Sequence, residues 1–463
     1  MRTNKASSFP PSDPKHAQTL SKQSLYNKIT QSYLKKDFRY WQWRILFSLI
    51  FGYAAFYLVR QNLPIAMTAL TAEFGYTKTQ LGWISTSFAI VYGVGKAVSG
   101  TFSDRSNARY FMSIGLFLSG CACFFMGFIS SFYPFIILWT LNACFQSMGS
   151  PPCQRLLTHW FPPKQLGTRW AIWNSSHQIG TAVITVVAGA YLLEQFGWRS
   201  VFFVPAVLVM ICAFFLFLGL RDTPESLGFA SIEEHTAQKN NEPPPAETAE
   251  SKLSFKEIFI SRVLKNRLVW YMCWANLFFY IVRFGLLIWA PTFLTENKGS
   301  SLAKASWDVA GFDIAAIFGG IMAGYVSDKV FDGRRGPVGV IFMIILMILL
   351  LYLWKIPTGS NFLNAFVMFA IGFFVSGPQI LQGVAAADFA SKKAAGAANG
   401  LTGTFGYLGA AFSGVGIGKI VDIWGWNAAF VIFAAAAFVS AFFFALTWNH
   451  KATPPAPLKK APA

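Results

Sequence analysis

A positive charge stands in the middle of the apolar stretch FYLVRQNLPIA, residues 56–66. The residue is Arg60, which lies 16 residues after Arg44 and 13 before Glu73. At a rise of about 1.5 Å per helical residue, this spacing puts Arg60 near the centre of a membrane-spanning helix. An arginine at that depth costs at least about 2.5–3.5 kcal/mol and usually has a function. The position therefore predicts a buried anionic partner.

Arg283, in FFYIVRFGLLIWAP, repeats this placement in the second half of the chain. It lies 16 residues after Arg267 and 13 before Glu296, and 223 residues after Arg60. If the chain is built from two repeated halves, the two arginines occupy equivalent depths. A pseudo-two-fold axis would then bring the two guanidinium groups face to face.

No acidic residue is well placed to neutralise both arginines. Asp313 is the one carboxylate far from the edge of a predicted span, and a single carboxylate cannot balance two guanidinium groups. A bound dianion is therefore the preferred partner. Phosphate suits guanidinium because the planar fork donates two parallel, charge-assisted hydrogen bonds. The alternative is a purely structural role for the arginines, which we favour less than phosphate binding.

Further polar residues share these spans. His177 lies three residues after Asn174, so their side chains stack on one helical face; titration near neutral pH and plain helix packing are equally good explanations. Lys96 lies eight residues from Asp104, so snorkelling to the membrane surface competes with anion binding. Tyrosines near these cations offer hydroxyls to phosphate or sugar oxygens, or else are interface aromatics: Tyr53, Tyr57, Tyr92 and Tyr280.

The composition indicates a polytopic membrane protein. Of 463 residues, 54% are hydrophobic and only 13% are charged, whereas soluble domains carry about a quarter charged residues. The net charge of +18 comes mostly from short loops and the two tails. That distribution favours positive-inside topology over a nucleic-acid partner, with an acidic partner for the tails as the weaker alternative. The six cysteines lie in apolar runs without zinc-ligand spacing, so we expect no disulfide, metal or other cofactor.

About twelve apolar runs have the length that crosses ~30 Å of hydrocarbon as a helix. They are expected at roughly 45–67, 80–103, 110–130, 132–156, 169–193, 200–220, 268–294, 304–327, 337–356, 361–388, 394–420 and 426–449. We predict an all-α polytopic fold with these parts: a basic cytoplasmic segment (1–44), a six-helix half (45–220), a cytoplasmic linker (221–265), a second six-helix half (266–449) and a cytoplasmic tail (450–463).

Two similar loops support the duplication and fix the expected orientation. GTFSDRSNARY (100–110) follows the second span and GYVSDKVFDGRRGP (324–337) the eighth, with Asp104 and Asp328 224 residues apart. Both loops are basic, as are the tails and the linker, so this side is expected to be cytoplasmic. The first ~40 residues are polar and basic and do not form a cleavable signal peptide. We expect a multi-pass protein of the cell inner membrane with both termini inside.

From about residue 40 to 450 the chain resembles the organophosphate:phosphate antiporters of the major facilitator superfamily. The likeness rests on GYAAFYLVRQN, YGVGKAVSGTFSDRSNARY, RWAIWNSSHQIG, YIVRFGLLIWAPTFL and AAGAANGLTGTFGYLGA. Within the family, LNACFQSMGSPPCQRLLTHW and SGPQIL look most like the hexose-phosphate transporter and sensor branch. The resemblance implies that Arg60 and Arg283 bind phosphate, with His177 at the site and Lys96 near the cavity. It also implies polar cavity positions at Tyr53, Tyr57, Tyr92, Asn174, Tyr280 and Tyr407.

The chain departs from the glycerol-phosphate members of that family at charged positions. Those members have Lys directly after the first arginine and Asp five residues after the second, where this chain has Gln61 and Ile288. Losing both charges together is expected if they pair with each other or share a network. Asp313 stands where the family tends to have Glu, so its role is open. Ser376 stands where glycerol-phosphate members have Tyr, which would leave room for a hexose phosphate.

These features predict an antiporter that imports a sugar phosphate in exchange for inorganic phosphate by alternating access. Glucose 6-phosphate is the expected sugar phosphate. A membrane receptor of the same fold that senses hexose phosphate is one alternative, since it needs the same two arginines. A proton-coupled symporter is another, with Asp313 as its titratable acid. No nucleophile–base constellation or nucleotide loop indicates an enzyme. We expect a monomer in contact with membrane lipid.

Overall fold

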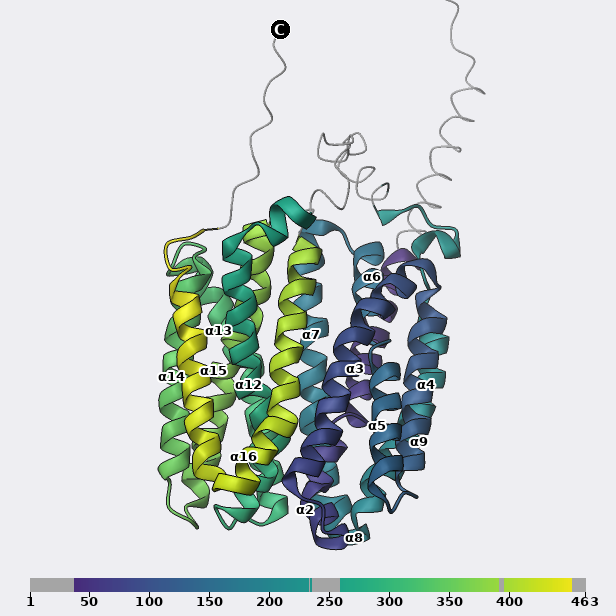
Figure 1. Ribbon diagram of the computed structural model, residues 1–463. Helices are drawn as coiled ribbons and strands as arrows, with labels where there is room; N and C mark the ends of the chain where they lie inside the picture. Colours follow the sequence, from purple (N-terminus) through teal and green to yellow (C-terminus); the bar gives the residue numbers. More distant parts are fainter. Residues whose placement is uncertain (1–36, 233, 235–258, 391–394, 452–463) are drawn as a thin grey trace, which may run out of the picture.

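The computed structural model describes residues 37–232, 234, 259–390 and 395–451. Within these ranges the chain is almost entirely helical and contains no strand. The helices run roughly parallel to one another and form two bundles side by side, one from each half of the sequence (Figure 1). Among the described residues, ten helices are long and apolar enough to cross a membrane.

The first bundle begins with a helix over residues 37–58. The predicted N-terminal segment (1–44) therefore overlaps this helix over residues 37–44. The elements that follow are α2 (Asn62–Phe74), α3 (Lys78–Arg105), α4 (Ala108–Met126), α5 (Phe132–Gln146), α6 (Ser150–Trp160), α7 (Pro163–Val186), η1 (Val187–Leu192), α8 (Leu193–Phe196), α9 (Trp198–Gly219) and η2 (Pro224–Leu227).

The second bundle contains fewer but longer helices. They are η4 (Phe259–Leu264), α12 (Arg267–Glu296), α13 (Leu302–Lys329), α14 (Arg335–Lys355), α15 (Asn361–Ala390) and α16 (Ala395–Ala445). The last of these covers the two final predicted spans, because Gly425 has φ 71° and ψ −178° and folds the chain back there. With this bend counted, and with α5 and α6 sharing the fourth span, each predicted span has a helical counterpart.

Two of the predicted spans are broken rather than continuous. The first is interrupted at residues 59–61 and the fourth at 147–149. Pro64 follows the first break, and Pro151 and Pro152 follow the second. A proline removes one backbone N–H and its ring clashes with the carbonyl four residues earlier, which is Arg60 in the first case. Because each break falls inside one apolar run of the sequence, hydrophobicity alone predicts one continuous helix at each place.

Several predicted segments lie outside the described residues. These are most of the N-terminal segment (1–36), most of the linker (233 and 235–258), the basic loop at 391–394 and most of the tail (452–463). The division of the chain into those segments therefore stays a prediction. We call the end of the molecule where α3 and α9 finish and α4 and α12 begin the basic end; it is at the top in Figure 1.

The two bundles are bonded together at the end opposite the basic end. Asp422 of α16 accepts hydrogen bonds from the backbone N–H groups of Lys78 (3.2 Å) and Thr79 (2.7 Å) at the start of α3. Lys78 also forms an ion pair with Glu296 of α12 at 3.1 Å. One turn or more deeper, the Thr86 hydroxyl donates to the carbonyl of Ala411 at 2.6 Å.

Toward the basic end these connections stop. The last one is the ring contact of Tyr92 with Tyr407, at 5.2 Å between centroids. Beyond it, the described residues of the two bundles share no hydrogen bond or ion pair. The structure is thus closed at the end opposite the basic end.

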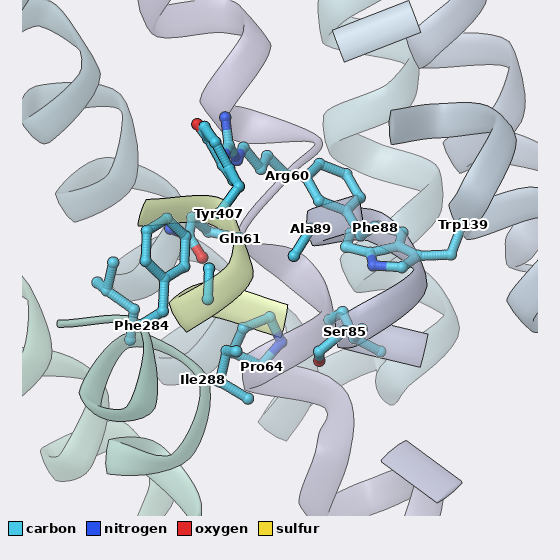
Figure 2. Close-up of a pocket in the computed structure, with 13 residues that line it drawn as sticks. Arg60, Gln61, Pro64, Ser85, Phe88, Ala89, Trp139, Phe284, Ile288 and Tyr407 are labelled. Atoms are coloured by element: carbon cyan, nitrogen blue, oxygen red, sulfur yellow. The ribbon is translucent and has the colours of Figure 1, made fainter. Parts of the chain in front are cut away.

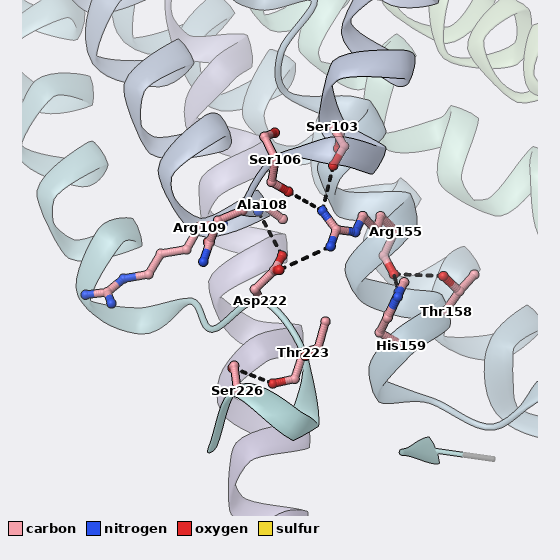
Figure 3. A network of polar contacts seen from close by, with 11 residues as sticks. Ser103, Ser106, Ala108, Arg109, Arg155, Thr158, His159, Asp222, Thr223 and Ser226 are labelled. Carbon is pink, nitrogen blue, oxygen red and sulfur yellow. Dashed lines mark hydrogen bonds and ion pairs between the residues drawn. The ribbon is translucent and has the colours of Figure 1, made fainter. Parts of the chain in front are cut away.

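A polar network ties the loops together at the basic end of the first bundle (Figure 3). Arg155 of α6 donates to the carbonyl oxygens of Ser103 (2.6 Å) and Ser106, and pairs with the Asp222 carboxylate at 3.1 Å. The other Asp222 oxygen accepts the N–H of Ala108, the first residue of α4, at 2.8 Å. This carboxylate therefore joins α4, α6 and the chain after α9.

The second bundle has a corresponding network. Arg335 at the start of α14 pairs with Asp328 of α13 and with Asp388 of α15 (3.3 Å), and also donates to the Ser327 hydroxyl at 3.0 Å. Asp328 belongs to the repeated loop identified in the sequence, so both halves fasten this loop with an arginine.

Replacing Asp222 with Asn is expected to lower thermal stability. The pair with Arg155 is mostly buried, at 15% and 16% side-chain exposure, and hydrogen bonds to charged groups contribute about 1.5–3 kcal/mol. The matched control is Asp332→Asn, since Asp332 is 81% exposed in its pair with Lys451 and such pairs contribute about 0–1 kcal/mol. Unfolding of the purified protein in detergent should show a clearly lower Tm for the first variant only. Equal Tm values would contradict a structural role for the network.

Candidate functional site

Arg60 lies at the break between helix 37–58 and α2, with 8% of its surface exposed. Its guanidinium carbon lies 4.2 Å from the ring centre of Tyr92, 5.1 Å from Tyr57 and 5.2 Å from Phe88. Figure 2 shows the side chain extended alongside Tyr407, with which it also interacts electrostatically. Aromatic faces attract a cation but do not neutralise it.

Arg283 lies in the middle of α12 with 5% of its surface exposed. One of its terminal nitrogens is buried without a hydrogen-bond partner. Asp313 of α13 is 2% exposed and interacts electrostatically with Arg283, but no carboxylate in the described parts of the chain comes within the 4.0 Å of an ion pair to Arg283 or Arg60. Within the described ranges, these two buried cations therefore have no carboxylate as an ion-pair partner, although burial of a charge is costly without one.

The two arginines share neighbours, although they come from different bundles. Tyr57, His177 and Tyr280 each interact electrostatically with both guanidinium groups. The fold therefore brings together the two charges that the sequence places 223 residues apart. An anion between them would be attracted by both guanidinium groups.

His177 of α7 is 5% exposed and packs against tyrosines of the first helix. Its ring centre lies 5.3 Å from that of Tyr57 and 6.4 Å from that of Tyr53. Nδ1 contacts the carbonyl oxygen of Asn174. If Nδ1 carries the proton for that carbonyl, Nε2 of the neutral ring is an acceptor. The half-buried Asn174 takes part here through its backbone oxygen.

Tyrosines connect the site across the bundle interface. Tyr407 of α16 contacts Tyr92 of α3 at 5.2 Å and Tyr280 of α12 at 5.8 Å between ring centres. Lys96 is half-buried one turn further along α3 and interacts electrostatically with Tyr92. The predicted phenol groups therefore surround the arginine pair, with Lys96 on the side of the basic end.

Ser376 is the predicted residue that the structure does not bring to this cluster. It is fully buried in α15, and its hydroxyl has no hydrogen-bond partner. The hydroxyl lies 2.7 Å from the point where a Cβ of Gly320 in α13 would stand. A tyrosine at position 376 would have to displace α13. The predicted effect of Ser376→Tyr on sugar binding is therefore combined with an effect on helix packing.

A cavity lies beside Arg60, on the side away from the basic end (Figure 2). Its polar lining is Arg60, Gln61, Ser85 and Tyr407. Ile288 of α12 lines the same cavity. Gln61 and Ile288, the two positions at which the resemblance to the glycerol-phosphate members predicts charges that this chain lacks, therefore line the same cavity.

The aromatic walls of this cavity include three residues that the sequence analysis did not single out. Phe88 and Trp139 lie on the side of the first bundle and Phe284 on the side of the second. The sequence carried a signal for two of them, since Phe88 precedes Tyr92 by one helical turn and Phe284 follows Arg283 directly. Trp139 gave no such signal, because nothing in the sequence relates α5 to the site.

The profile of the Major Facilitator Superfamily matches residues 49–414 of the chain. The chain belongs to this superfamily. Within it, the relatives identify the organophosphate:phosphate antiporter family. A "Probable hexose phosphate transport protein" of Chlamydia trachomatis is 41% identical, with 90% of this chain and 93% of the relative covered.

Two further family members come from Escherichia coli (strain K12). The "Membrane sensor protein UhpC" is 39% identical over 87% of this chain and 91% of its own. The "Hexose-6-phosphate:phosphate antiporter" is 35% identical over 83% and 86%. Among solved structures, a bacterial homologue of the human lysosomal transporter Spinster superposes with a TM-score of 0.73 at 18% identity, covering 90% of this chain and 99% of that one. The superfamily fold with two six-helix halves, predicted from the sequence, is thereby confirmed.

Membership makes the chain a multi-pass membrane protein of a transporter family rather than of an enzyme family. The names of two of these relatives refer to the transport of hexose phosphates. The buried arginine pair is the feature of this chain whose charge is complementary to a phosphate group. The roles of individual residues are taken up as proposals below.

Proposed function

We propose that the chain is a secondary transporter that exchanges a sugar phosphate, glucose 6-phosphate first of all, for inorganic phosphate. The observation that carries this proposal is the pair of buried arginines, which have no carboxylate partner among the described residues and which both interact electrostatically with Tyr57, His177 and Tyr280. A phosphate dianion between the guanidinium groups supplies the missing charge with bidentate hydrogen bonds.

The places where the bundles touch support alternating access as the mechanism of this exchange. Arg60 belongs to one bundle and Arg283 to the other, so an anion held by both draws the bundles together around the site. Bonds such as those of Asp422 with the start of α3 close the end opposite the basic end and must break when that end opens. An empty site leaves two cations facing each other, which disfavours reorientation and makes exchange obligatory.

In this mechanism the remaining site residues bind and orient the substrate. Lys96 adds a third positive charge on the path from the basic end, and Nε2 of the neutral His177 ring accepts a hydrogen bond from a hydroxyl group of the phosphate or the sugar. The phenol groups of the surrounding tyrosines serve the phosphate and sugar oxygens: Tyr53, Tyr57, Tyr92, Tyr280 and Tyr407. No cofactor takes part.

The test is uptake of labelled glucose 6-phosphate by the purified protein in liposomes. Uptake is expected into liposomes loaded with inorganic phosphate and not into phosphate-free ones. Equal uptake into both would overturn obligate exchange. Competition by unlabelled glucose 6-phosphate, glycerol 3-phosphate and glucose then ranks the substrates, and glucose without its phosphate should not compete.

A hexose-phosphate sensor is the second candidate function, because the sensor relative is 39% identical and the antiporter relative 35%. Both functions need the arginine pair, so the site does not separate them. Turnover does: many labelled molecules accumulated per protein identify a transporter. Saturable binding of one molecule per protein without accumulation would identify a sensor.

A proton gradient is expected to have no effect on exchange at fixed phosphate loading. Asp313 is the acid that a proton-coupled mechanism would use, and it is buried beside Arg283. In the exchange mechanism the phosphate itself supplies the negative charge, so coupling to protons is unnecessary. Uptake measured with and without an imposed pH gradient checks this. Gradient-driven accumulation that Asp313→Asn abolishes would show a symporter instead.

We further propose that the protein is a monomer of the cell inner membrane with both termini and the basic end in the cytoplasm. The distribution of Lys and Arg supports this orientation. The segments 1–44, 221–265 and 450–463 are proposed as its cytoplasmic parts.

A further inference from the structure

A groove lies on the outer surface of the first bundle and shares no lining residue with the cavity beside Arg60. Helix 37–58 and α9 enclose it, with a volume of about 370 Å³. Its walls are the residues Phe47, Phe51, Gly52, Cys212, Phe215 and Leu216. Gly52 brings the helices close, because a Cβ there would stand 2.7 Å from Leu216.

The groove opens to the membrane. Phe47 is 51% exposed, Phe51 74% and Phe215 63%, and these side chains face hydrocarbon in a chain of this fold. Arg44 lines the same groove where it reaches the basic end. An apolar channel within the membrane that ends at a cation has the shape and polarity of a phospholipid site.

Arg44 is one of three arginines gathered at that end. Arg44 donates to the carbonyl oxygen of Leu218 at 2.9 Å, and Arg221 donates to the same oxygen at 3.1 Å. Both guanidinium groups lie over the ring of Trp41, at 4.7 and 5.1 Å. Arg109 donates to the carbonyl of Phe217 at 2.6 Å.

Capping the end of α9 accounts for only part of this charge. A helix C-terminus carries about half a negative charge, whereas three guanidinium groups bring three positive charges. None of the three forms an ion pair with a carboxylate within the described ranges. Asp222 is engaged by Arg155, and Figure 3 shows Arg109 directed away from that pair.

The three charges also act on one another. Burial lowers the pKa of Arg221, and the neighbouring Arg109 and Arg44 lower it further. Each guanidinium has five N–H donors, of which only a few are used by backbone carbonyls. The cluster therefore has both unbalanced charge and spare donors, which an anionic group next to the groove would satisfy.

We propose that this groove binds an anionic phospholipid. The headgroup phosphate lies on Arg44, Arg109 and Arg221, and one acyl chain fills the groove between helix 37–58 and α9. This site is independent of the proposed transport function, since it shares no residue with the central cluster.

The experiment is native mass spectrometry of the delipidated protein in detergent, titrated with phosphatidylglycerol or phosphatidylcholine of the same acyl chains. The wild-type protein is expected to bind the first phosphatidylglycerol at least tenfold more tightly than phosphatidylcholine. In Arg44→Gln/Arg221→Gln this preference should be lost, because two basic residues at a membrane surface contribute about 30-fold to the binding of an anionic lipid. The matched control is Arg267→Gln, an exposed arginine at the basic end of the other bundle, which should leave the preference unchanged.

A second variant keeps the test independent of the capping role of the arginines. Cys212→Trp fills the groove but leaves all three charges. It should weaken the binding of both lipids, because the acyl chain can no longer enter the groove. An excess of inorganic phosphate should not displace the lipid, since it lacks that chain. Equal affinity of the wild type for the two lipids would overturn the proposal, as would an unchanged preference in the double variant. Full displacement by inorganic phosphate would show a site for free anions instead.

Discussion

Arg60→Ala is expected to lower sugar-phosphate exchange by about 30-fold to more than 1000-fold while the protein stays folded. Truncating one partner of a buried, hydrogen-bonded charge pair costs about 2–5 kcal/mol, and 1.4 kcal/mol is tenfold. The same loss is expected for Arg283→Ala, because one anion needs both guanidinium groups. Exchange is measured in liposomes loaded with inorganic phosphate.

Two further variants give this prediction its controls. Arg60→Lys keeps the charge but loses the planar fork, so it should retain more exchange than the alanine variant. Arg199→Ala removes an arginine that is 42% exposed and paired with Glu73, and it should exchange like the wild type. Retained exchange in Arg60→Ala would contradict a phosphate-binding role for Arg60.

Gly82→Leu is expected to prevent the closure seen in this structure and to lower exchange by about 100-fold. A Cβ at Gly82 of α3 would stand 2.5 Å from the carbonyl oxygen of Gly414 in α16. The three atoms nearest to this Cβ all belong to the backbone of Gly414 and Val415, so the bundles must separate there to accept a side chain. If overpacking makes the closed state about 3 kcal/mol less stable, the population of the closed state falls by about 100-fold.

The matched control is Gly100→Leu in the same helix, where a Cβ would meet nothing within 4 Å. It should leave exchange unchanged. A cysteine introduced at Ala89, which lines the cavity beside Arg60, reports opening directly. It should react faster in the Gly82→Leu background with a thiol reagent applied opposite the basic end. Normal exchange in Gly82→Leu would show that this contact is not part of the transport cycle.

The outline of the fold and the deep burial of the two arginines are both readable from the sequence. Arg60 and Arg283 stand at equal distances from their flanking charges, and depth in the membrane follows directly from residue count at a fixed rise per residue. Gln61 and Ile288 face one cavity, as their joint departure from the family pattern suggested. Position along a helix is what a sequence encodes most plainly.

Rotation about a helix axis and breaks in a helix are harder to read. Ser376 is turned toward Gly320 of α13, and no contact joins it to the arginine pair in the described residues. The break at Arg60 depends on Pro64, but prolines lie inside α9, α12 and α15 without ending them. Neighbouring helices decide whether the freed backbone groups are satisfied. Which end of the molecule is closed cannot be predicted from the sequence either, because one sequence must support both closed and open states.

Equilibrium binding of inorganic phosphate to the purified protein tests the central claim most directly. The titration compares the wild type with Arg60→Ala, Arg283→Ala and the double variant. If both arginines hold one anion, each single variant should bind phosphate at least 30-fold more weakly, and the double variant should lose less than the two single losses combined. Unchanged phosphate affinity in either single variant would contradict the account.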